Sequence, residues 1–110
     1  MDIDSVYKNF SETIRELGVF LYDETDEKIK EIIFEDYPID SLNLSNNVLE
    51  LLLSEGYIDS ITVEKTKRIL FIYREIEADN KANTINEFKQ SSKWRELLEL
   101  HDDVNNSLYI

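Results

Sequence analysis

The side chains that most often perform acid–base catalysis or bind metals are few and dispersed in this chain. His101 is the only histidine, and there are no cysteines, which excludes thiolate chemistry and disulfides. Asp102 and Asp103 follow His101 directly, and consecutive residues of a helix point in different directions, so the three side chains cannot converge. We predict no catalytic residue, and we expect His101 to lie at the edge of the hydrophobic core.

Carboxylates are abundant, but their spacing fits neither a metal site nor a catalytic pair. The stretch from Asp23 to Glu27 lacks the glycine and the alternating ligands of a calcium loop. Glu75 and Glu77 are two residues apart and would face different sides of a helix. No glycine-rich phosphate loop, nucleophile elbow or zinc-protease motif is present. We therefore expect a protein that is not an enzyme and has no metal site and no cofactor.

The negative charge is concentrated in the first half of the chain. The net charge is −12; residues 1–60 hold 15 acidic and 4 basic residues, whereas residues 61–110 hold 9 and 8. Direct binding to nucleic acid or to an anionic membrane is disfavoured, because both need positive charge on the protein. A cationic protein is the natural partner, and solubility alone is the other explanation of such a charge.

The densest charge lies in DETDEKIKEIIFEDYPID, residues 23–40, with eight carboxylates and two lysines. If this segment is helical, Glu27, Glu31 and Glu35 recur every fourth residue on one side. Like charges at this spacing destabilise a helix by a few tenths of a kcal/mol, without benefit to the free protein. We predict a docking surface for a basic partner, extended by Tyr22 at its start. Its predicted residues are Asp23, Glu24, Glu27, Glu31, Phe34, Glu35, Tyr37 and Asp40.

Helices are expected to position these side chains. Two glycines and one proline in 110 residues are too few for a turn-rich β fold, and 42% apolar residues indicate a globular chain. We predict an all-α bundle of five or six helices in one domain, residues 1–110. The predicted helices are one that starts after a cap at Asp4 or Ser5, three over about 25–36, 45–55 and 62–78, a short one from Thr84 with a capping box to Glu87, and a longer one around Trp94.

The apolar spacing also predicts which faces are buried. Val6, Phe10, Ile14, Leu17 and Leu21 form one continuous stripe, which Gly18 either ends or weakens. The helix over 45–55, closed by Gly56, is apolar on most sides and is expected in the middle of the domain. A hairpin is the alternative for residues 57–75, disfavoured because EKTKR lacks a tight-turn glycine or asparagine. The last helix is predicted to carry Trp94, Leu97, Leu98, His101 and Val104 on one face.

A compact, cysteine-free, strongly acidic chain without catalytic apparatus resembles the small immunity proteins that bacteria pair with secreted toxins. ETIRELGVFLYDETDEKIKEII, followed by LELLLSEGYIDSITVEKTKRILFIYREIE, is similar in layout to helical immunity proteins of contact-dependent and other polymorphic toxin systems. The resemblance covers about two-thirds of the chain and includes no diagnostic motif. It implies a one-to-one complex with a cationic toxin domain, often a nuclease, whose active or substrate-binding surface is covered.

Two other functions fit the same sequence. Carboxylates can mimic the phosphates of DNA and occupy a nucleic-acid-binding protein, but such mimicry favours acids spread along an extended face. A helical adaptor would instead recognise its partner through Phe34, Phe71 or the C-terminal SLYI; Phe71 lies opposite the apolar stripe of its helix. The sequence lacks a secretion signal and any apolar run that would span a membrane, so a soluble, cytoplasmic protein is expected.

The role of Phe34 distinguishes a docking surface from an ordinary solvated face. If Phe34 is an anchor, Phe34→Ala raises the dissociation rate of the partner by the equivalent of ~2 kcal/mol and leaves the isolated protein stable. If the following connection covers Phe34, the same variant loses much of its unfolding free energy instead. Urea unfolding of the variant distinguishes the two outcomes.

Overall fold

The computed structural model describes residues 2–35, 44–79 and 84–108, and within these ranges every regular element is helical. This confirms the predicted all-α bundle. The hairpin considered for residues 57–75 is excluded, because one long helix begins at Ser60. The elements are α1 (Ile3–Arg15), η1 (Val19–Asp23), α2 (Asp26–Ile29), η2 (Lys30–Glu35), α3 (Asn46–Ser54), α4 (Ser60–Asp79), α5 (Ile85–Gln90) and α6 (Ser92–Ser107).

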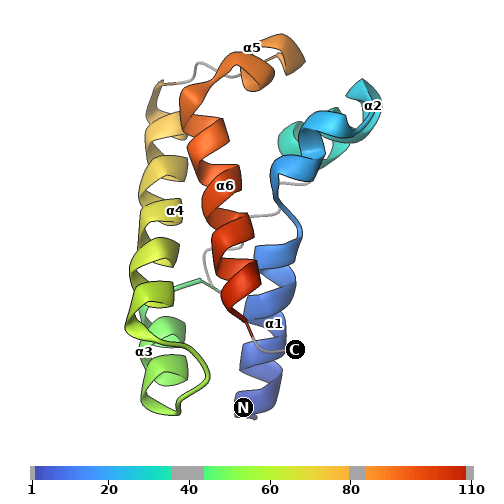
Figure 1. The fold of residues 1–110 in the computed structure, drawn as a ribbon. Helices are drawn as coiled ribbons and strands as arrows, with labels where there is room; N and C mark the ends of the chain where they lie inside the picture. Colours follow the sequence, from blue (N-terminus) through green and yellow to red (C-terminus); the bar gives the residue numbers. More distant parts are fainter. Residues whose placement is uncertain (1, 36–43, 80–83, 109–110) are drawn as a thin grey trace.

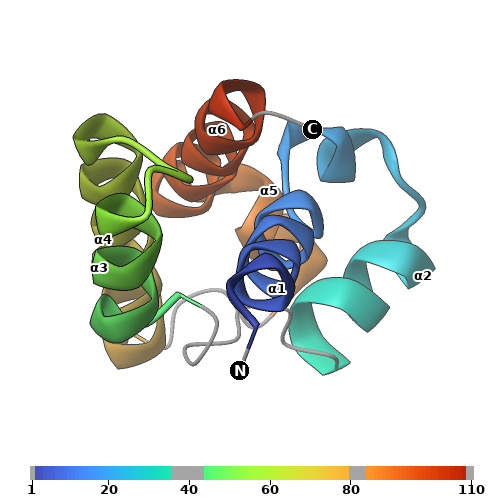
Figure 2. The ribbon, with the colours of Figure 1, turned by 90° about the horizontal axis from the view of Figure 1, so that it is seen from below.

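Three helices form the body of the bundle (Figure 1). The long helices α4 and α6 lie side by side and make the most extensive contact in the structure, and α1 packs against α6. Seen from below, α3 and α4 lie on one flank, α2 lies on the other flank, and α1 and α6 stand between them (Figure 2). Segment 19–35 and α4 are therefore on opposite sides of the molecule.

The predicted apolar faces meet in one core. The five residues of the first stripe and the five predicted on α6 are all buried. His101 is more deeply placed than expected. It lies inside the core, fully buried, rather than at its edge, because its ring finds a hydrogen-bond acceptor there: His101 Nδ1 lies 2.8 Å from the carbonyl oxygen of Ile14.

The first helix is shorter than its apolar stripe. It begins at Ile3, earlier than predicted, because the carboxylate of Asp2 caps it by accepting a hydrogen bond from Asp4 N. The helix ends at Arg15, and after the extended Gly18 the chain enters the 3₁₀ turn η1. Leu17 and Leu21 are buried although they lie beyond the helix. Apolar spacing alone does not reveal this break between α1 and η1.

Two consecutive residues of α6 hold this break in place. His101 donates to the carbonyl oxygen of Ile14, one of the terminal carbonyls of α1 that have no partner within the helix. The Asp102 carboxylate accepts a hydrogen bond from Val19 N at 3.1 Å. A Cβ on Gly18 would collide with Asp102 Oδ1, so a larger residue here would displace the carboxylate that holds Val19 N. We call these contacts the α6 clamp.

The α3 helix is located at an edge of the bundle, not in its middle as predicted. Leu49 and Leu52 are fully buried, but Leu51 and Leu53 are 41% and 40% exposed. Its end matches the prediction: Gly56, at φ 80°, follows the helix. The amides of Gly56 and Tyr57 bond the carbonyls of Leu53 and Leu52 at 3.1 and 2.9 Å, which is a Schellman motif. Other helix caps also lie where they were predicted: Thr84 Oγ1 accepts from Glu87 N at 3.1 Å.

The α6 clamp predicts a difference between two neighbouring carboxylates. Asp102→Ala leaves Val19 N without its acceptor and should lower the unfolding free energy by about 1–2 kcal/mol. Asp103→Ala is the control, because it removes the same charge but only an exposed ion pair with Lys65 at 3.8 Å, worth about 0.5 kcal/mol or less. Equal losses in urea unfolding would show that Asp102 does not hold the break.

Candidate protein-binding surface

The acidic segment folds as the sequence predicts at its start and differently at its end. Thr25 caps α2 by accepting a hydrogen bond from Lys28 N at 3.2 Å. From Lys30 to Glu35 the chain forms the π-helical turn η2, whose hydrogen bonds span five residues instead of four. Ile29 and Ile33 are buried and join this segment to the core.

Four of the eight predicted partner-binding residues have described side chains, and all four are exposed. They project from the end of η1, from the turn after it and from the two helical segments that follow. Phe34 and Glu35 belong to η2, but their side chains lie outside the described part of the structure, as do Tyr37 and Asp40 entirely. The four exposed residues, which we call the acidic face, are Asp23, Glu24, Glu27 and Glu31.

The acidic face has no counter-charge among the described residues. No described lysine or arginine lies within ion-pairing distance of its four carboxylates, and Lys28 and Lys30 do not pair with them. In the same segment, the Asp26 carboxylate does form an ion pair, 3.2 Å from Lys89 Nζ on α5. Among the described residues, nothing but solvent and salt therefore relieves the repulsion within the acidic face.

Several basic residues lie on the other side of the molecule. The α4 helix carries four bases against four acids, and it lies on the opposite flank from α2 (Figure 2). Arg68 Nε lies 3.1 Å from Glu96 Oε2 on α6, and Lys67 and Arg74 line a hollow beside the start of α3. The fold thus places a helix of zero net charge on one flank and the acidic segment on the other.

Tyr22, which we expected to extend the surface, faces inward instead. Its ring centroid lies 5.5 Å from that of Phe88, and the Arg95 guanidinium lies 4.9 Å from the ring. Burial raises the pKa of the Tyr22 hydroxyl, while Arg95 opposes this shift. The sequence analysis instead missed Val19 and Phe20, the two apolar residues of η1 that are exposed. The only sign of their exposure in the sequence is that they fall outside the apolar stripe to which Leu17 and Leu21 belong.

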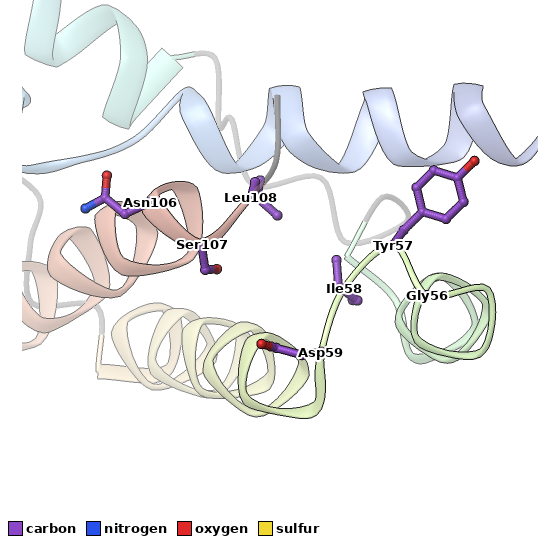
Figure 3. A pocket seen from close by; sticks show the side chains of 7 residues that line it. All are labelled: Gly56, Tyr57, Ile58, Asp59, Asn106, Ser107 and Leu108. Carbon is purple, nitrogen blue, oxygen red and sulfur yellow. The ribbon is translucent and has the colours of Figure 1, made fainter.

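A separate hollow of about 420 Å³ opens between the α3–α4 turn and the end of α6 (Figure 3). Its polar groups already serve the fold: the Asp59 carboxylate accepts from Thr62 N at 2.8 Å, and the Ser107 hydroxyl donates to Val104 O at 2.8 Å. The hydrogen bonds from Thr62 lower the pKa of Asp59. Tyr57 and Asn106 point away from each other (Figure 3), so the lining does not converge on a ligand.

His101 is held as a neutral imidazole. A carbonyl oxygen only accepts hydrogen bonds, so Nδ1 carries the proton that it donates to Ile14, and Nε2 has no partner among the described residues. Burial lowers the pKa of His101 to about 4, although the Ile14 carbonyl and Asp102 act in the opposite direction. No nucleophile is positioned at its ring in the described structure, and its contacts are structural.

The described residues contain no group of three or more histidine, aspartate or glutamate side chains that could hold a metal ion. None of the described helices combines the length and the apolar character that crossing a membrane requires. No protein-family model matches the chain, and neither a curated protein nor a solved structure shows significant similarity to it. Assignment of function therefore rests on the physical properties of the surface.

Neutral His101 predicts a loss of stability in mild acid. In the unfolded chain the imidazole takes up a proton near pH 6.5, whereas in the folded chain it does so only near pH 4. The unfolded state therefore binds more protons between these values, and the unfolding free energy falls as the pH falls, by about 2 kcal/mol between pH 7.5 and pH 5.

The His101→Gln variant provides the comparison, because it removes the titrating group and keeps a side chain that can donate to Ile14. Urea unfolding of this variant should depend much less on pH over the same range. Parallel pH profiles for the two proteins would contradict a buried neutral imidazole.

Proposed function

We propose that this protein binds and neutralises a cationic protein partner through the acidic face. The observation that carries the proposal is that Asp23, Glu24, Glu27 and Glu31 are exposed and have no described internal counter-charge. Glu27 gains from its position in the first turn of α2, but the four carboxylates otherwise repel one another in the free molecule. Against a basic surface, the same charges accelerate encounter and fix its orientation.

The partner that fits best is a toxin domain, most simply a nuclease, in a one-to-one complex in the cytoplasm. A nuclease must carry positive charge where it binds its phosphate substrate. An acidic face that covers this surface excludes the substrate by charge and by bulk. The resemblance of the chain to acidic helical immunity proteins supports this proposal.

The grouping of the charges favours this function over imitation of DNA. The acidic face spans η1 and the short helical segments after it, on one flank of a molecule that measures 41 × 24 × 22 Å. An imitation of the phosphate array would spread carboxylates along an extended face. An adaptor role remains the second candidate, because Phe71 on α4 is 51% exposed and lies on a different helix from the acidic face.

Reversal of charge on the acidic face tests the proposal. The expected partner is encoded by the gene next to the one for this chain. It should have a basic C-terminal domain that stops growth when that domain is expressed in the cytoplasm. Co-expression of the wild-type chain should restore growth.

Glu27→Lys combined with Glu31→Lys should slow association with that basic domain by about tenfold or more and flatten the dependence of the association rate on salt.

Glu64→Lys combined with Glu77→Lys makes the same change of net charge on α4 and serves as the control. This pair should leave the association rate within about twofold of wild type. An unchanged rate for the Glu27 and Glu31 pair, or equal slowing by both pairs, would remove the acidic face from the interface.

A further inference from the structure

Two apolar side chains on η1 stand exposed next to the acidic face. Val19 is 40% exposed and Phe20 is 44% exposed, and Asp23 and Glu24 follow them within one turn of chain. An exposed aromatic ring beside carboxylates leaves apolar area in water without contributing to the core.

The fold holds these two side chains outward. Leu21, the next residue, is fully buried and ties η1 to the core, while the Asp102 carboxylate holds Val19 N at 3.1 Å. The turn is closed by a hydrogen bond from Leu21 N to Gly18 O at 3.1 Å. A Cβ on Gly18 would lie 3.0 Å from Cδ1 of Phe20, so the ring rests against the glycine backbone. The apolar pair is thus fixed before any partner arrives.

We propose that Phe20, together with Val19, is the apolar anchor of the docking surface, and that it receives an apolar side chain of the partner surrounded by lysines or arginines. The inference rests on the proposed function and identifies the chemistry of the contact. Interfaces draw most of their binding energy from a few aromatic or aliphatic anchors, while surrounding charges set the rate and orientation of encounter. Charge complementarity with Asp23 and Glu24 selects a basic occupant.

Phe71 provides an internal comparison. It is exposed to a similar degree, 51%, but the Arg68 guanidinium lies 5.2 Å from its ring centroid and Arg68 also pairs with Glu96. A cation therefore already covers this ring. Its helix carries equal numbers of acids and bases, which gives a cationic partner no reason to prefer it.

Two synthetic peptides of equal length and equal lysine content test the anchor. One carries leucine and the other serine at its remaining positions, and binding is followed through the backbone amide shifts of the ¹⁵N-labelled protein. The leucine peptide should bind about tenfold more tightly than the serine peptide and shift the amides of η1 and α2. Phe20→Ala should abolish this advantage, Val19→Ser should reduce it, and Phe71→Ala should preserve it.

The possible outcomes test the apolar anchor and the proposed function independently. Suppose that Glu27→Lys with Glu31→Lys weakens the binding of both peptides, but the leucine peptide still binds more tightly to Phe20→Ala and Val19→Ser. The apolar anchor is then wrong, and the acidic face is still supported as a binding surface. If neither peptide responds to that charge reversal, the acidic face itself is wrong. Equal binding of the two peptides to the wild type also overturns the anchor. Urea unfolding of each variant identifies any that fail to fold, and Val19→Ser then carries the test in place of Phe20→Ala.

Discussion

The α6 clamp, which joins α6 to the end of α1, is the contact on which the rest of the structure depends. His101 satisfies a terminal carbonyl of α1, and Asp102 satisfies the first amide of η1. The Ile14 carbonyl would otherwise be left unpaired in the core, which costs about 1–3 kcal/mol for a buried group, whereas the exposed amide of Val19 would lose an ordered acceptor. Because the break is held, the chain leaves the bundle at Gly18 and carries the following acidic segment to the flank away from α4 (Figure 2).

This placement keeps the acidic face away from the basic residues of α4. Ion pairs between Lys65 and Asp103 and between Arg68 and Glu96 tie α4 to α6 on one side, so these cations are engaged far from the acidic face. Such exposed pairs contribute little to stability. The consequence for function is larger, because a surface of one sign attracts a partner of the other sign over about 10 Å at moderate salt. The exposed pair on η1 adds an apolar contact within that field.

The sequence predicts what depends on neighbours along the chain. The 3.6-residue spacing identified the buried face of α6, and local cap chemistry located Thr84 and Gly56. The errors involve partners that are distant in sequence. The end of α1 is set by Asp102, 83 residues after Val19, and His101 is buried because Ile14 offers a carbonyl. Likewise, Tyr22 turns inward toward Phe88 and Arg95. The exposure of Asp23, Glu24, Glu27 and Glu31 needs no distant partner, whereas their role in docking stays a prediction.

The central claim is that the acidic face carries a negative potential that the described residues do not neutralise. Paramagnetic relaxation of the backbone amide protons by a cationic and an anionic nitroxide of equal size measures this potential directly, because each probe gathers where the opposite charge prevails. The account predicts that the cationic probe is most strongly enriched, and the anionic probe most strongly depleted, at Asp23–Glu31, with a much smaller difference along α4. A potential at Asp23–Glu31 no more negative than along α4 would contradict it.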